Sequence, residues 1–271
     1  MFEPFDGARV LITGGLGFIG SNLARRLAGQ VSHLDSMQDP FTDLEINYRS
    51  QLYLLEACRQ HNPGVRIVYT STRQVYGRPV RLPVDEEHPL APVDVNGIHK
   101  LAGGWYHILY HRTYGLRTTS LRLTNTYGPR MRVLDARQTF VGLWLRQLIE
   151  GKEIEVYGDG TQARDLNYVD DVVNAILSTA GSPKTIGGIY NLGSDEVISL
   201  INLARLLIEL NGGGSFRFVP FPPDRKVIDV GDYYADYSRI QRALDWRPTI
   251  KLRDGLARTL AYYRANRAHY W

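Results

Sequence analysis

The sequence predicts an α/β fold built on a parallel sheet, and two observations support that fold class. The first is that short β-rich runs alternate with longer stretches of helical periodicity along most of the chain. The second is a glycine-rich turn at residues 13–20, which stands between an apolar run and a helical pattern. With 271 residues, 44% of them hydrophobic and 22% charged, the chain has an ordinary globular composition.

The glycine turn predicts a dinucleotide-binding site. It follows an apolar run at 9–12, interpreted as a short buried strand, and precedes a helical pattern at 21–27. Glycine at every third position lets the backbone turn tightly and approach a pyrophosphate, and the free N–H groups of the helix attract that anion. The residues expected to bind the cofactor are Gly14, Gly17, Phe18, Ile19 and Gly20. A tight turn that only packs a helix on a strand is the alternative.

Composition excludes several classes of protein. No apolar run approaches the roughly 20 residues needed to span a bilayer, and the N-terminus lacks the apolar core of a signal peptide. The single cysteine, Cys58, rules out a disulfide framework and fits a reducing cytoplasm. The net charge of +4 is scattered and forms no nucleic-acid stripe. We therefore expect a cytoplasmic protein with an anionic small-molecule ligand, no bound metal, no nucleic acid and no membrane contact.

Periodicity places the remaining elements. Helices are expected at 43–61, 97–114, 138–150, 199–210 and about 253–267, with a further one after Asp170 and Asp171. We interpret those two aspartates as helix caps. Strands are expected at 65–71, 116–123, 153–157, 189–192 and 216–219.

Four segments together resemble the extended short-chain dehydrogenase/reductase family, in particular its NAD-dependent nucleotide-sugar epimerases and dehydratases. They are residues 13–20, 69–77 (YTSTRQVYG), 121–129 (LRLTNTYGP) and 157–171 (YGDGTQARDLNYVDD). The resemblance covers nearly the whole chain. It implies a Rossmann-type doubly wound parallel sheet with a small C-terminal α/β substrate domain, NAD as cofactor and a nucleoside-diphosphate sugar as substrate. The dinucleotide-binding domain would be 1–153 and the mainly substrate-binding domain 154–271, with 170–192 returning to the Rossmann sheet.

The chain departs from this family in length. About 50 residues of the family pattern are absent after Leu27, including the strand whose terminal acid holds the adenosine ribose. Asp35 follows Gly14 by a spacing that would suit that acid, but the resemblance places it in a loop on the nicotinamide side. Either a segment has been left out of this sequence or the chain carries a true deletion. The expectation of NAD rather than NADP therefore rests on the family resemblance, because the strand that would decide between them is not in the sequence.

The second departure is chemical. In the family a Tyr-x-x-x-Lys pair on the second long helix takes a proton as hydride leaves for NAD⁺. Here Lys100 is present and Asn96 occupies the tyrosine position, where an amide cannot act as a base. The resemblance still implies that Lys100 binds the nicotinamide ribose and that the hydroxyl of Thr72 bonds the sugar oxygen being oxidised. A hydroxyl that ends a strand and bonds local backbone is the alternative for Thr72.

A relocated base would restore the chemistry. His99 lies three residues after Asn96, so the two share a helix face, and a neutral imidazole is a competent base. A histidine that only packs beside the lysine is the alternative, and the loop residues 32–33 or 35–36 are further candidates. Related 4,6-dehydratases carry an acid and base directly after the Thr72 position. Arg73 and Gln74 stand there instead, which disfavours dehydration by that route.

The substrate side is implied by the resemblance. Asn125, in the turn after a strand, would touch the sugar or its diphosphate, and Arg164 and Arg225 would grip the diphosphate through bidentate hydrogen bonds. The alternatives are a turn asparagine that satisfies its own loop and a salt bridge from Arg164 to Asp165 or Asp170. Residues 138–140 are candidates to line the sugar or base pocket, and a place in the hydrophobic core is the alternative for Phe140.

The same resemblance implies a homodimer through the helices at 43–61 and 97–114. Their aromatic residues could form that interface or pack inside one chain; these are Tyr48, Tyr53, Trp105, Tyr106 and Tyr110.

The leading function is an NAD-dependent nucleotide-sugar epimerase that oxidises C4 of the sugar transiently and returns the hydride. The first alternative is a related oxidation or dehydration with a relocated base, suggested by Asn96. The second is a catalytically silent NAD-binding sensor. The sequence leaves open which nucleotide sugar is bound, which carbon of the sugar is acted on and which residue serves as the base.

Overall fold

The computed structural model describes residues 11, 19, 35–135 and 139–271. Most of the expected glycine turn, namely Gly14, Gly17, Phe18 and Gly20, lies outside the described residues, as do residues 32–33 and positions 9, 10 and 12 of the apolar run before the turn. Leu11 of that run is described and is 80% exposed, which disagrees with the buried strand expected there. Ile19 is described, and it packs against both of the larger hydrophobic clusters.

The central sheet has three described strands in the order β1-β2-β6, all parallel. They are β1 (Arg66–Thr72), β2 (Arg117–Leu123) and β6 (Ile189–Asn191). Thr72 pairs in register with Leu123, so β1 and β2 end at the same level. Because parallel strands end at one edge of a sheet, this edge is where a doubly wound fold builds its binding site.

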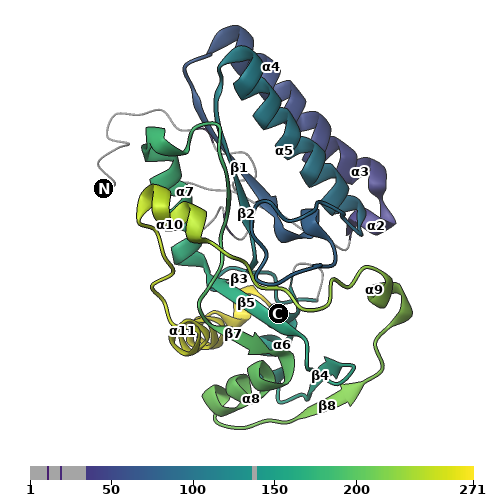
Figure 1. Ribbon diagram of the computed structural model, residues 1–271. Coiled ribbons are helices and arrows are strands. Elements are labelled where there is room, and N and C mark those ends of the chain that lie inside the picture. Colours follow the sequence, from purple (N-terminus) through teal and green to yellow (C-terminus); the bar gives the residue numbers. More distant parts are fainter. Residues whose placement is uncertain (1–10, 12–18, 20–34, 136–138) are drawn as a thin grey trace.

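Helices cover both faces of this sheet (Figure 1). One face carries α4 (Ser50–His61) and α5 (Val95–Tyr114) side by side, and the other carries α7 (Val169–Gly181) and α10 (Ser238–Leu244). Burial on both faces explains why β1 and β2 lack a strict polar–apolar alternation.

The helix expected at 43–61 is a continuous helical run with a change of pitch. It comprises α3 (Pro40–Leu44), a π-helical turn η2 (Glu45–Arg49) and α4, and is preceded by α2 (Asp35–Gln38). The Asp39 side chain caps α3 by accepting from the Thr42 N–H at 3.0 Å. Asp35 therefore begins a helix next to α5, where the resemblance implied a loop.

The remaining strands and α-helices lie below the central sheet in Figure 1. The strands are β3 (Asn125–Tyr127), β4 (Ile154–Tyr157), β5 (Ala163–Tyr168), β7 (Val197–Ser199) and β8 (Phe216–Val219). The helices are α6 (Phe140–Ile149), α8 (Leu200–Asn211), α9 (Pro223–Val227) and α11 (Leu252–Ala265). Short 3₁₀ turns are η3 (Arg73–Tyr76), η4 (Pro183–Thr185) and η5 (Arg267–His269). Strand β5 pairs with β3 in parallel and with β7 antiparallel, while β4 pairs with β8 in parallel.

The α/β fold with a parallel sheet is confirmed, and each helix and strand expected after residue 35 is present with ends shifted by a few residues. Three short strands, β3, β5 and β7, were not expected. The prediction that Asn125 lies in a turn is wrong, because it opens β3 and pairs with Leu166 of β5. Within the described residues, no helix is long and apolar enough to cross a membrane.

The prediction that Asp170 and Asp171 cap a helix is also wrong. Tyr168 is the N-cap of α7, and no side chain caps it. Asp171 is buried and accepts from both the N–H and the hydroxyl of Thr249, at 3.1 and 2.8 Å, and from the Ile250 N–H at 3.0 Å. Its role is to fasten the segment before α11 to α7.

Candidate active site

Thr72 ends β1 at the carboxyl edge of the sheet and is 8% exposed. Its side-chain oxygen accepts from the Gln74 N–H at 3.3 Å, which caps the 3₁₀ turn η3. That bond is the local one anticipated as the alternative for this hydroxyl. The hydroxyl itself donates to Oε1 of Gln74 over a long 3.5 Å contact, which a closer acceptor on a ligand could replace. Thr72 is thus fixed at the edge where a substrate would lie.

Lys100 lies in the first half of α5 and is 6% exposed. Its Nζ donates to the Thr70 carbonyl of β1 at 3.1 Å and lies 5.2 Å from the centre of the Tyr69 ring. Burial lowers the pKa of Lys100 to about 8, while the nearby Asp43 carboxylate opposes that shift. An ammonium has three hydrogens and one described acceptor here, so it can still donate to a bound ligand.

Asp43 of α3 gathers three side chains from two elements. Its Oδ1 lies 2.7 Å from His99 Nδ1, and its Oδ2 accepts from the amide nitrogens of Asn96 at 3.1 Å and Asn47 at 2.9 Å. All four side chains are buried or nearly so. An ionised carboxylate only accepts hydrogen bonds, so Nδ1 of His99 carries the hydrogen and Nε2 of a neutral imidazole is left as an acceptor.

Asn96 cannot replace a tyrosine base and has a different place in this cluster. It is 0% exposed, and its amide nitrogen is committed to Asp43. Its Oδ1 is buried and has no hydrogen-bond partner among the described residues. The same is true of Oδ1 of Asn125, at the start of β3. Buried acceptors of this kind require donors.

The fit to NAD can be tested on these groups. Lys100 has free donors, and Asn96 and Asn125 have free buried acceptors at the same end of the sheet. Ribose and sugar hydroxyls both donate and accept, so these groups suit a polyhydroxylated ligand such as a dinucleotide or a sugar. The residues present therefore fit the cofactor, although its pyrophosphate turn lies outside the described residues.

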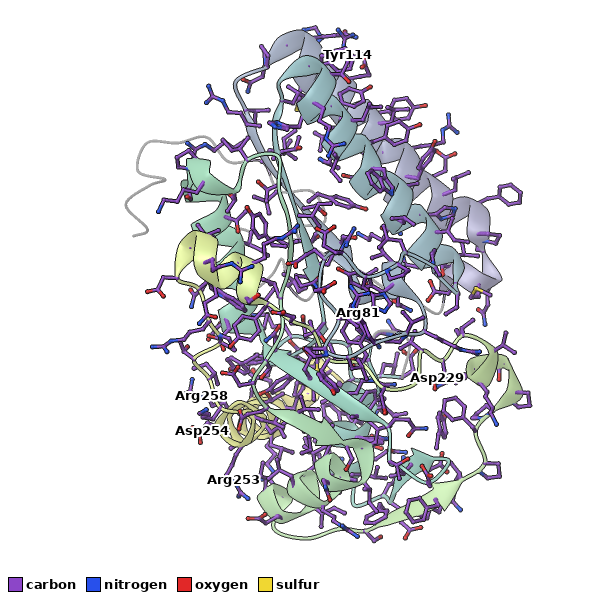
Figure 2. All side chains as sticks on the ribbon, viewed as in Figure 1. Arg81, Tyr114, Asp229, Arg253, Asp254 and Arg258 are labelled. Carbon is purple, nitrogen blue, oxygen red and sulfur yellow. The ribbon has the colours of Figure 1, made fainter. Side chains whose placement is uncertain are left out.

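Arg164 is 5% exposed and is already partnered. Its guanidinium donates to the carbonyls of Ala163 (2.9 Å) and Gly231 and lies 3.4 Å from Asp229. The suggested salt bridge to Asp165 or Asp170 is absent. Asp229, labelled in Figure 2, lies just after α9, so Arg164 joins β5 to the segment that follows that helix. Burial, with the nearby Arg73 adding repulsion, lowers the pKa of Arg164 to about 10.

Arg225 lies on α9, with its guanidinium 5.7 Å from the centre of the Tyr157 ring at the end of β4. No hydrogen bond joins it to another candidate residue in the part of the chain that the structure describes. The structure thus brings Thr72, Asn96, His99, Lys100 and Asn125 to one end of the central sheet. Arg164 lies on β5, the middle strand of the sheet below, and Arg225 lies on the separate helix α9.

Sequence reasoning missed two residues here. Asp43 was expected only as the first residue of a helix, and its link to His99 spans 56 residues. Arg73 was noted only as the residue that replaces an acid. The sequence offered one signal for the role of Asp43. A carboxylate stands at the start of one expected helix and a histidine near the start of the next, and the two helices were expected to pack together.

Known protein families and structures resemble this chain over most of its length. A profile of the NAD dependent epimerase/dehydratase family matches residues 26–193. A dTDP-glucose 4,6-dehydratase from an Actinoplanes strain is 34% identical over 215 residues, covering 79% of this chain and 65% of that protein. The solved UDP-glucose 4-epimerase of Thermotoga maritima with UDP-glucose superposes with a TM-score of 0.85 at 26% identity, covering 94% of this chain and 98% of that one.

UDP-glucuronic acid decarboxylase 1 of Xenopus tropicalis is 27% identical over 321 residues, covering 97% of this chain and 74% of the relative. That alignment is longer than the whole chain of 271 residues, so the relative carries at least 50 positions that this chain lacks. The chain spans just under two thirds of the Actinoplanes protein. On the family match and these similarities, the chain belongs to the NAD-dependent epimerase/dehydratase family, whose relatives here are nucleotide-sugar enzymes of the extended short-chain dehydrogenase/reductase type.

Proposed function

We propose that the protein is a nucleotide-sugar epimerase that oxidises C4 of the sugar transiently, with His99 as the base in place of the missing tyrosine. The observation that carries this proposal is the 2.7 Å contact between His99 Nδ1 and Asp43 Oδ1. His99 is the residue directly before Lys100 on α5. A histidine held by a carboxylate through one nitrogen presents the other as a base, an arrangement that recurs in enzymes of unrelated folds.

NAD⁺, when bound beside Lys100, would supply the acceptor for the hydride that leaves C4. Nε2 of His99 takes the proton of the C4 hydroxyl, and the imidazolium that forms is stabilised by Asp43. The Thr72 hydroxyl donates to the developing carbonyl oxygen, and Lys100 holds the ribose and adds positive charge nearby. The proton and the hydride then return, the hydride to the opposite face of C4.

The relatives support the substrate class. A UDP-glucose epimerase, a dTDP-glucose dehydratase and a UDP-glucuronic acid decarboxylase all act, by their names, on nucleoside-diphosphate sugars. Dehydration is disfavoured in this chain because Arg73 and Gln74 follow Thr72, and neither is an acid. Arg164 and Arg225 remain the predicted diphosphate ligands; Arg164 would have to share its guanidinium with Asp229.

We also infer a cytoplasmic homodimer formed through α4 and α5. Three of the five candidate aromatics pack within the chain: Tyr48 and Tyr106 share a hydroxyl–hydroxyl contact of 3.0 Å, and Tyr110 is 6% exposed. Tyr53 and Trp105 stay 61% and 49% exposed on the same pair of helices. These two residues would form the centre of the interface.

A substrate panel tests the function. The NAD-loaded protein is incubated with UDP-, dTDP-, GDP- and CDP-hexoses deuterated at C4, and the products are separated and analysed by NMR. We expect at least one sugar to change configuration at C4 with its deuterium retained. Tight NAD binding with no new sugar from any donor would favour the silent sensor, and a product that has lost water would favour a dehydratase.

A further inference from the structure

Arg73 is a half-buried cation that has no anionic partner within 4 Å in the described part of the chain. It opens the 3₁₀ turn η3 directly after Thr72. Its Nη1 is shielded from solvent without a hydrogen-bond partner, and its guanidinium lies over the Tyr233 ring, 5.2 Å from the centroid. Burial lowers the pKa of Arg73, although Asp165, Asp229 and Asp94 partly offset that effect at longer range.

The acids around Arg73 are engaged elsewhere. Asp165 accepts from the Thr124 hydroxyl and, at 3.2 Å, from the Ala235 N–H. Asp94 caps α5 by accepting from the Gly97 N–H, and its other oxygen accepts from the Gln74 amide. The carboxylates that could neutralise Arg73 are therefore fixed by other donors.

Neighbouring arginines show the contrast. Arg122 donates to the Tyr76 hydroxyl at 2.8 Å, and Arg164 has two carbonyls and Asp229. Leaving a charge buried without a partner costs several kcal/mol, and a guanidinium is shaped to accept a carboxylate through two parallel hydrogen bonds. An arginine held in this state beside a substrate-binding edge is suited to bind an anion that arrives with the ligand.

We propose that Arg73 binds a carboxylate on the sugar ring, so that the substrate is a nucleoside-diphosphate hexuronate. This inference rests on the proposed function, because it takes the sugar to lie against Thr72. Arg73 follows Thr72 directly at the carboxyl end of β1, and the proposal takes its anion to lie on the sugar ring whose oxygen Thr72 contacts. A planar carboxylate can meet the guanidinium edge while Tyr233 covers its face.

Binding measurements with matched sugars test this proposal without requiring turnover. The NAD-loaded protein is titrated calorimetrically with UDP-glucuronate, UDP-glucose and UDP alone. A charged hydrogen-bond pair contributes about 1.5–3 kcal/mol, so we expect glucuronate to bind at least about tenfold more tightly than glucose. In Arg73→Gln that ratio falls to near one while UDP-glucose and UDP bind as before. Arg73→Lys keeps the charge without the planar geometry and retains part of the preference.

Arg81 supplies the control, since it is exposed and paired with Asp85 at 2.7 Å in the same loop region. Arg81→Gln should keep the full preference. Equal binding of both sugars by the natural protein would overturn the proposal. A loss in Arg73→Gln that is equal for UDP and both sugars would also overturn it and assign Arg73 to the diphosphate. Failure of the epimerase reaction alone would leave the binding ratio intact, which separates the two proposals.

Discussion

The two sides of the candidate site differ in how their polar groups are satisfied. On the α5 side, Asp43 engages two asparagines and His99 within 3.1 Å, and Lys100 donates to Thr70. Most of the polar groups there are thus held by one another, although Oδ1 of Asn96 has no partner among the described residues. On the η3 and β3 side, Nη1 of Arg73 and Oδ1 of Asn125 are buried without partners among the described residues. A preorganised network suits catalytic groups, which must be oriented before the substrate arrives. Unpaired groups suit ligand recognition, because the ligand completes them.

The largest effect is expected when the proposed base on the α5 side, His99, is removed. In His99→Ala we expect turnover to fall about 10²–10⁴-fold, the range that general base catalysis contributes. Equilibrium binding of NAD and sugar should change little. Steady-state kinetics and calorimetry measure the two effects. His61→Ala, at the exposed end of α4, is the control and should match the natural protein.

Removing the positioning carboxylate should have a smaller effect. Asp43→Asn keeps the size of the side chain but no longer favours hydrogen on Nδ1 of His99 or stabilises its imidazolium. We expect kcat to fall about 10–10²-fold and the pH dependence of kcat to change, which a purely structural role would not cause. Asp39→Asn, at the exposed cap of α3, should leave the pH profile as it is.

Asp171, a buried carboxylate outside the candidate site, tests through protein stability whether groups with a full set of hydrogen bonds depend on them. Asp171→Ala removes the acceptor for the Thr249 and Ile250 N–H groups. We expect the free energy of unfolding to fall by about 2–4 kcal/mol, since each buried donor left unpaired costs about 1–3 kcal/mol. Urea denaturation measures it. Asp170→Ala, at the exposed neighbour, should change stability by less than about 0.5 kcal/mol. Equal losses would restore the capping interpretation.

Lys100 gives a prediction for pH. Its folded pKa of about 8 lies below the unfolded value of 10.5, so protonation favours the unfolded state. The penalty is complete below pH 8, where it amounts to about 3 kcal/mol, and it disappears as pH rises toward 10.5. Without NAD, Lys100→Met should therefore be more stable than the natural protein at pH 7, with the difference shrinking between pH 8 and 10. A difference independent of pH would contradict the assigned shift.

The smallest effect is expected on thermal stability when Arg73, on the η3 side of the site, is replaced. Arg73→Leu removes a half-buried charge whose Nη1 is shielded and has no described partner, so Tm should stay the same or rise by a few degrees in the absence of sugar. Thermal unfolding followed by circular dichroism measures it. A fall comparable to that of Asp171→Ala would mean that Arg73 is already part of a satisfied network, and the comparison between the two sides would fail.

The fold was accessible from the sequence because its signals are local. Periodicity located α5 and α8, and β-rich runs located β1 and β2. The short strand β5 was missed because its sequence, ARDLNY, is largely polar; it is a strand through pairing with β3 and β7, which are distant in sequence.

The site was predictable only where a motif carried it. Thr72 and Lys100 were identified through the family resemblance, and Asn96 through its departure from it. The partners of His99 and Asp171 depend on how helices and loops meet in space, at separations of 56 and 78 residues. An aspartate at a helix start indicates a cap by local rules, and tertiary contacts overrode that rule at Asp171.

The most direct test of the central claim is the formation of NADH in a single turnover. The NAD-loaded protein is mixed with a sugar that the panel identifies as a substrate, and nicotinamide fluorescence is followed by stopped flow. If Asp43 and His99 form the base, the natural protein shows a transient rise in NADH and His99→Ala shows a rise slowed at least about 10²-fold. An unchanged rate of NADH formation in His99→Ala would contradict the account.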